Sequence, residues 1–348
     1  PEIEGIYNPE MLKRIGKKSH EEPSVKACIL THSHLDHFGD LGFLDPRIPV
    51  YCSRETCISI KAYEDVTKGS EEKQWTSYQE SRKLDEWIPI GYYWIDEYGK
   101  AHKTTKDKAT HERVILQFEI PPEEIKRDFI TKSKSKIDDL EIELFPVDHS
   151  SFDAQACVIY TSDAKIAYTG DIRFHGFKTQ ESIDFVEKAK NADILITEGT
   201  KINEEVNFTE YDVEEKTKEI VKNTQGLVIV DFSARNLEEF LIYKRIAEET
   251  GREFVISPKS ALFLLYKDMK NYIKERFPSL LSRILVFEKN SSSTRSRRSI
   301  SKYKEIERVE DEEIRKNPQN YIVNLSYYDF EKLVDFSPPK GSVLIVNS

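Results

Sequence analysis

The sequence of 348 residues predicts an α/β protein with two domains. Two observations lead to this prediction. In the first part of the chain, three short strand patterns each end at a histidine or a carboxylate: before His32, before His149 and at Asp171. After Glu198, apolar runs alternate with helical patterns, which is the βαβ rhythm of a parallel sheet covered on both faces. We place the domains at residues 1–202 and 203–348.

Within the first domain, a mostly apolar run leads directly into the first histidines. An insert of about 53–127 follows, charged and aromatic, for which we expect helices and a hairpin around Glu97. Alternation with a period of two then resumes, as expected for a half-buried strand. The predicted strands are Val25–Leu30, Leu140–Phe145, Ala156–Thr161 and Lys165–Tyr168.

In the second domain the predicted helices are Val213–Asn223, Leu237–Glu249 and Ser260–Tyr272. The predicted strands are Leu227–Val230, Phe254–Ile256, Ile284–Phe287 and a final buried strand at Ser342–Asn347.

Composition limits the class of protein. The four cysteines form no close pair, so we expect buried free thiols and a reducing, cytoplasmic compartment. No apolar stretch is long enough to span a bilayer, and no membrane partner is expected. The net charge of -10 argues against sequence-independent coating of DNA, but bound dications and a local basic groove can still hold a phosphate chain.

A histidine-rich segment carries the strongest functional signal. His32, His34, Asp36 and His37 follow the order H-x-H-x-D-H. Side chains two apart lie on one side of an extended loop, so His32 and His34 can bind one metal ion while Asp36 and His37 reach a second. Imidazole and carboxylate ligands suit Zn²⁺, with Mn²⁺ or iron as alternatives. The competing interpretation is a solvated polar loop without metal.

Two further residues stand where strands end. His149 follows the strand that begins at Leu140, and Asp171 follows Gly170, which allows the backbone to turn. Asp171 is the candidate to bridge two metal ions, because a two-metal site needs a shared carboxylate. A core histidine and a turn-forming aspartate are the respective alternatives.

Taken in order, His32 to His37, then His149, then Thr169-Gly170-Asp171 resemble the signature motifs of the metallo-β-lactamase superfamily. The resemblance implies an αββα sandwich with two divalent metal ions, for which we expect zinc. It also implies that His32, His34 and His149 bind one ion, that Asp36 and His37 bind the other, and that Asp171 bridges them.

The segment Ile194–Thr200 resembles the acidic motif that opens the β-CASP domain of nucleic-acid-processing members such as ribonuclease J. The resemblance implies that the second domain is β-CASP-like and that Glu198 supports the metal ligands. Val228–Asn236 resembles a strand-to-helix turn that binds phosphate, with Ser233 and Arg235 as the contacts. A helix cap at Ser233 and a surface charge at Arg235 are the alternatives.

The sequence also departs from this family. A short segment precedes His32 and no histidine follows His175, so the N-terminal strands and the C-terminal histidine motifs of the family are missing or reduced. Pro1 stands where a methionine would begin a natural chain, and we expect a piece of a longer protein.

These observations lead to a functional hypothesis: a metal-dependent ribonuclease in which a hydroxide bridging two metal ions attacks a phosphodiester bond of single-stranded RNA. Asp36, Asp171 and Glu198 are the expected catalytic residues, and a homodimer is an open option. The alternatives are a hydrolase of a small ester or thioester with the same fold, and a non-catalytic scaffold subunit.

Overall fold

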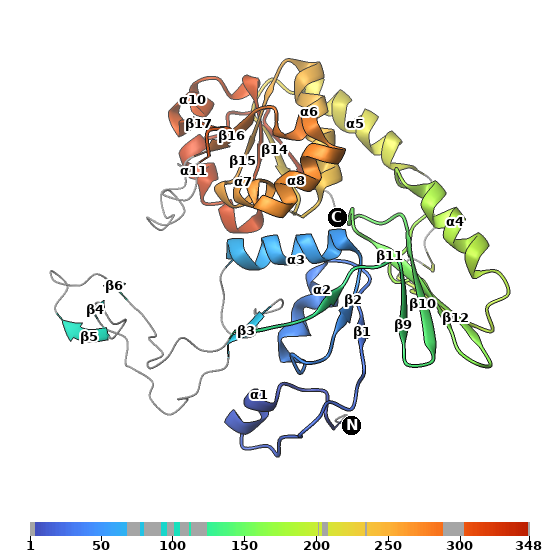
Figure 1. Cartoon of the computed structure of the whole chain (residues 1–348). Coiled ribbons are helices and arrows are strands. Elements are labelled where there is room, and N and C mark those ends of the chain that lie inside the picture. The colour runs from blue at the N-terminus through green and yellow to red at the C-terminus, as the bar shows by residue number, and fades with distance from the viewer. Residues whose placement is uncertain are drawn as a thin grey trace.

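The chain forms a mixed α/β protein with parallel and mixed sheets (Figure 1). The computed structural model describes residues 4–67, 77–79, 92–95, 101–104, 111–112, 124–200, 202–203, 208–233, 235–287 and 303–346. In this described part, one group of sheets is built from residues up to 196, and a six-stranded sheet is built entirely from residues after 227.

A five-stranded sheet of order β13-β12-β11-β10-β9 forms the middle of the chain. Its strands are β9 (Lys134–Ile137), β10 (Leu140–Pro146), β11 (Gln155–Tyr160), β12 (Lys165–Tyr168) and β13 (Ile194–Ile196). They pair antiparallel except for β12 with β13, which are parallel. The three strands expected between residues 140 and 161 and at 165–168 are confirmed.

Apolar side chains alternate between the two faces of this sheet, so both faces are packed. On one face, Phe185 of α4 (Thr179–Ala189) packs with Ala156, Val158 and Ala167. On the other face, Ile142, Leu144 and Cys157 pack with Ile29, which belongs to a second sheet.

This second sheet is three-stranded and parallel, in the order β1-β2-β8. Its strands are β1 (Cys28–Ile29), β2 (Val50–Tyr51) and β8 (Phe129–Ile130); around it lie α1 (Pro9–Arg14), α2 (Leu35–Phe38), η1 (Gly39–Phe43) and α3 (Arg54–Thr67). The strand expected at Val25–Leu30 is thus present but short. Arg127, which is buried, holds the connection between α2 and β2 by donating to the backbone oxygens of Leu41, Leu44, Asp45 and Ile48.

The expected insert contains α3 and small antiparallel sheets. One pairs β3 (Ser77–Gln79) with β7 (Glu124–Lys126), and the other has the order β5-β4-β6, with β4 (Tyr92–Ile95), β5 (Ala101–Thr104) and β6 (His111–Glu112). The expected hairpin around Glu97 fits the antiparallel pairing of β4 with β5, although residues 96–100 lie outside the described residues.

The six-stranded sheet is parallel throughout and has the order β17-β16-β15-β18-β14-β19. Its strands are β14 (Val228–Asp231), β15 (Glu253–Ile256), β16 (Ile284–Phe287), β17 (Ile306–Val309), β18 (Tyr321–Asn324) and β19 (Val343–Val346). The helices around it are α5 (Glu210–Asn223), α6 (Leu237–Thr250), α7 (Pro258–Leu265), α8 (Lys267–Arg276), η4 (Pro278–Leu281), α10 (Asp311–Lys316), η5 (Pro318–Asn320), η6 (Tyr327–Asp329) and α11 (Lys332–Phe336).

Local sequence signals fix several of these helices. Thr209 caps α5 in a capping box with Asp212, and Asn236 caps α6 by accepting from the Glu239 amide. Helix α6 ends at Gly251, which has a left-handed φ of 70°. The parallel sheet expected in this domain is confirmed.

Two expectations here were wrong in detail. The single helix expected over Ser260–Tyr272 is two helices, because Tyr266 has an extended ψ of 135°. The break lets α7 contact β16 while α8 contacts η4, and no glycine or proline marks it in the sequence. The last strand lies at the edge of the sheet next to β14, and its side chains alternate between half-buried and exposed instead of being buried, so one of its faces is open to solvent.

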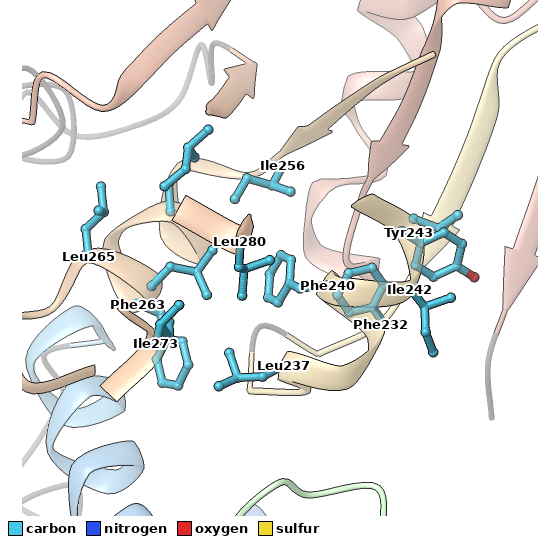
Figure 2. Close-up of a cluster of buried hydrophobic side chains, with 14 of the residues drawn as sticks. Phe232, Leu237, Phe240, Ile242, Tyr243, Ile256, Phe263, Leu265, Ile273 and Leu280 are labelled. Carbon is cyan, nitrogen blue, oxygen red and sulfur yellow. The ribbon is translucent and has the colours of Figure 1, made fainter. Parts of the chain in front are cut away.

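Helix α3 joins the two halves of the molecule. Its residues Ile58 and Ala62 belong to the same buried cluster as Phe263 of α7 and Ile273 of α8, and Figure 2 shows the second-domain side of this cluster. The four cysteines are free thiols, and all but the half-buried Cys28 are buried, as expected. Among the described residues, none of the helices combines the length and the apolar character required to cross a membrane.

Candidate metal centre

Four histidines converge beyond the C-terminal end of β1. His32 is fully buried on the loop after this strand, and His34 has an extended backbone and caps α2. His37 lies within α2, so the segment is an extended loop only up to His34 and is helical after it. His149 enters from the loop after β10, 115 positions from His34 in the chain, and its Nε2 lies 3.2 Å from His34 Nδ1.

One oxygen of Asp171 lies at the centre of this group. Asp171 Oδ2 is 3.3 Å from His37 Nε2, 3.6 Å from His149 Nε2 and 3.8 Å from His32 Nε2. Two sets of ligand atoms result, each with its members within 4.8 Å of one another: His32, His34 and His149, and His32, His37 and Asp171. His32 is the residue common to both sets, and Asp171 belongs to the second set only.

This arrangement fits a metal ion in three ways. A tetrahedral ion with bonds of about 2.1 Å places its ligands roughly 3.4 Å apart, which matches the spacings around Asp171. His32 Nε2 is buried without a hydrogen-bond partner in the described structure, which is costly unless something binds it. Its other nitrogen, Nδ1, lies 3.1 Å from Thr31 Oγ1 and so is oriented by the protein.

The electrostatic setting favours the neutral form of His32, His34 and His149, which is the form that binds metal. Burial lowers the pKa of His32 far below its ordinary value, and the neighbouring histidines lower it further. Burial also lowers the pKa of His34, and burial together with His34 lowers that of His149 to about 3. Burial raises the pKa of Asp171, with His37 acting in the opposite direction. Buried clusters of histidine and aspartate therefore exist that could hold metal.

Asp36 differs from the expected arrangement. It lies in the first turn of α2 and its side chain is 79% exposed, with an oxygen 3.7 Å from His37 Nε2. It belongs to neither set of clustered ligand atoms. The helical turn that begins after His34 directs Asp36 away from the position that an extended loop would have given it.

Gly170 fixes the position of Asp171. Its φ is +56°, a conformation that favours glycine, and a Cβ atom there would lie 2.8 Å from Thr31 Cγ2. The chain after β12 thus passes directly against the residue that precedes His32. Close approach at Gly170 is what brings the carboxylate of Asp171 to the histidines.

Glu198 lies outside the cluster of candidate ligands and contacts the residue that follows Asp171. It follows β13, and its Oε1 accepts a hydrogen bond of 2.8 Å from the backbone amide of Ile172, next to Asp171. This contact supports the loop that carries Asp171, and the charge of Glu198 contributes to the raised pKa of Asp171.

Of the two expected phosphate contacts, Ser233 is exposed, whereas Arg235 is engaged with the protein itself. Ser233 is exposed and its Oγ accepts from the Arg235 amide, whereas the cap of α6 is Asn236. Arg235 is not a surface charge: its Nη1 donates to the backbone oxygen of Ser33 at 2.7 Å. In this structure its guanidinium is directed at the loop that carries His32 and His34.

Sequence reasoning missed Arg173 and Asp148. Asp148 is fully buried, and its carboxylate accepts from Arg173 Nε at 3.1 Å and from the Gly176 amide at 2.7 Å. Arg173 also contacts Glu210 of α5 at 2.7 Å and Glu238 of α6 at 3.3 Å. One arginine thus ties the His149 loop to two helices of the second domain, and the position of Asp148 directly before His149 was the only available signal.

A pocket of about 950 Å³ opens between the cluster and the second domain. His34, His149 and Asp171 line one part of it, and Phe232, Asn236 and Ile242 line the side formed by the second domain. Pockets of this size accept ligands up to about the size of a small drug molecule. These three candidate ligands are therefore accessible from the junction of the two halves.

Comparison with known proteins bears on the fold. Neither the known protein families nor the curated proteins contain a match to this sequence. Among solved structures, a crystal structure of a protein of unknown function from Enterococcus faecalis V583 is similar, with a TM-score of 0.63 and 21% sequence identity. The match covers 99% of this chain and 68% of that chain. The likeness establishes a shared mixed α/β fold along nearly the whole chain.

Proposed function

We propose that this protein is a metal-dependent hydrolase with a metallo-β-lactamase-type αββα sandwich and a β-CASP-like second domain, and that it cleaves RNA phosphodiester bonds. The observation that carries the proposal is the position of Asp171 Oδ2 within 3.8 Å of three histidine nitrogens. A carboxylate oxygen among neutral imidazoles is typical of a metal-bridging ligand.

Each protein group has a distinct task in this proposal. His32, His34 and His149 would hold one ion, and His37 and Asp171 would hold the second, with Asp36 close enough to His37 to join them by a side-chain rotation. When bound, two divalent ions, which we expect to be Zn²⁺, supply charge stabilisation at the attacked phosphate and lower the pKa of water.

The neighbouring groups position these ligands. Glu198 holds the backbone beside Asp171, and Thr31 orients His32. Because burial and neighbouring histidines lower the pKa of His32 and of His149, the nitrogens of these two ligands are neutral at pH 7 and lose no proton when metal binds.

The pocket supports a substrate that enters between the domains. A second candidate substrate is a small ester or thioester, because the pocket lining is acidic and would repel a phosphodiester. The lining contains one arginine, Arg173, and five carboxylates: Asp171, Glu198, Glu210, Glu238 and Glu239. Two divalent ions would add about four positive charges and offset most of this repulsion for a phosphodiester.

The test combines metal analysis with activity assays. Purified protein is expected to contain about two metal ions per chain and to cleave single-stranded RNA in a metal-dependent manner. Asp171→Asn should abolish cleavage and release metal without unfolding the protein. The control Asp163→Asn changes an exposed carboxylate in the turn between β11 and β12 and should leave both unchanged.

Three results would change the proposal. Hydrolysis of small esters without RNA cleavage would favour the second candidate. Metal binding with neither activity would favour a scaffold role. Wild-type protein that binds no divalent metal would end the proposal.

A further inference from the structure

Arg235 connects the second domain to the metal-ligand loop. It follows β14 in the chain, whereas its Nη1 donates at 2.7 Å to the backbone oxygen of Ser33, 202 positions away. Ser33 is the residue between the candidate ligands His32 and His34. A shift of the Ser33 peptide therefore moves both ligands.

The guanidinium is held in a defined place. Its central carbon lies 4.8 Å from the centre of the Tyr63 ring of α3, within the range of a cation–π contact, and 6.0 Å from that of Phe38. Burial lowers the pKa of Arg235, and the charge of Asp153 opposes that shift. An arginine in such a setting is pre-organised, so its hydrogen bond to Ser33 costs little additional entropy.

Ser33 is also held from its side chain. Its Oγ lies 2.8 Å from Ser59 Oγ of α3 and 3.2 Å from Asp153 Oδ1, and both partners belong to the first domain. Among the hydrogen bonds of Ser33 in the described part of the chain, the bond from Arg235 connects it to the second domain. The ligand loop is thus fixed jointly by the two domains.

We propose that Arg235 is a positioning residue that sets the geometry of the metal-ligand loop through Ser33, and that metal affinity therefore depends on how the second domain is docked. This inference rests on the proposed metal centre. It differs from the phosphate contact expected from the sequence, because a guanidinium engaged with Ser33 and Tyr63 acts on the loop and not on a substrate.

The experiment compares three variants of the full chain. Arg235→Met removes the hydrogen bond and the charge. Arg235→Lys keeps the charge without the planar fork. Lys259→Met is the matched control, because the Lys259 ammonium in α7 lies over the same Tyr63 ring at 5.1 Å and is exposed. Folding is checked by circular dichroism, and the dissociation constants of Zn²⁺ and Co²⁺ are measured by competition with a chelator.

We expect Arg235→Met to raise the dissociation constant roughly 10- to 100-fold, as removal of groups that orient metal ligands commonly does. The visible spectrum of bound Co²⁺ should change with it. Arg235→Lys should give a smaller rise, and Lys259→Met none. If Arg235→Met does not fold, the rise in the Lys variant and its altered Co²⁺ spectrum decide the matter.

Two results would overturn the inference. One is folded Arg235 variants with the wild-type affinity and Co²⁺ spectrum, whether or not activity on RNA is lost; loss of activity alone would point to a substrate contact. The other is an equal rise in Lys259→Met, which would assign the effect to Tyr63 packing. A wild-type protein without metal affinity would instead refute the proposed function, and this inference would fall with it.

Discussion

Acid should destabilise the metal-free protein through His149. The pKa of this histidine falls from 6.5 to about 3 on folding, because the ring is buried and faces His34. His149 is therefore protonated below about pH 6.5 in the unfolded chain, but only below about pH 3 in the folded protein. The stabilisation is complete above pH 6.5 and is lost progressively as the pH falls toward 3.

The magnitude follows from the shift. Each pH unit between the two pKa values is worth about 1.4 kcal/mol, so lowering the pH from 7.5 to 4.5 should cost about 2–3 kcal/mol from this side chain alone. The side chain is only 18% exposed, so solvent screening does not remove the effect. His32 and His34, whose pKa values are also lowered, act in the same direction.

The assay is urea unfolding in the presence of a chelator at the two pH values. His149→Asn should reduce the difference between the two unfolding free energies by about 2–3 kcal/mol relative to the wild type. His175→Asn serves as the control, because His175 lines the same pocket outside the cluster. An unchanged pH dependence in His149→Asn would refute the view that a buried, neutral cluster is present.

Three other changes test the same site. Asp171→Asn should stabilise the metal-free protein, because burial raises the pKa of this carboxyl and its ionised form is unfavourable at pH 7. The same change should weaken Zn²⁺ binding at least about 10-fold. Both effects are read from the free energy of unfolding with and without Zn²⁺, and a change of the same sign in the two conditions would contradict the prediction. Gly170→Ala should cost about 2–4 kcal/mol from the left-handed φ and the contact with Thr31, read from urea unfolding, and a neutral effect would argue against the close approach. Arg173→Met should cost about 3–5 kcal/mol by leaving Asp148 buried without its charged partner, and thermal unfolding that matches the wild type would count against this network.

Local patterns in the sequence were sufficient for several of the elements. Alternation with a period of two placed β10, and the βαβ rhythm placed the parallel sheet, because the side-chain periodicity of each element is a local property. The caps at Thr209 and Asn236 are local as well, since each side chain bonds an amide three residues away, but neither was predicted from the sequence, which suggested Ser233 as a cap instead. The break at Tyr266 carried no such signal.

The candidate site divides in the same way. The sequence by itself identified the side chains that cluster in space, because H-x-H-x-D-H places three histidines on one short segment and strand ends supply His149 and Asp171. Only the tertiary structure decided that Asp36 turns outward on α2.

The contacts of Arg173 and Arg235 were also decided by the tertiary structure alone. Arg173 and Arg235 are isolated charges in the sequence, and they gain their roles from partners in distant segments, Glu210 and Ser33. The physical reason is that a periodic pattern involves residues only a few positions apart. The partners of a long side chain are instead the residues that the packing of α3 and the two sheets places within hydrogen-bond distance of it.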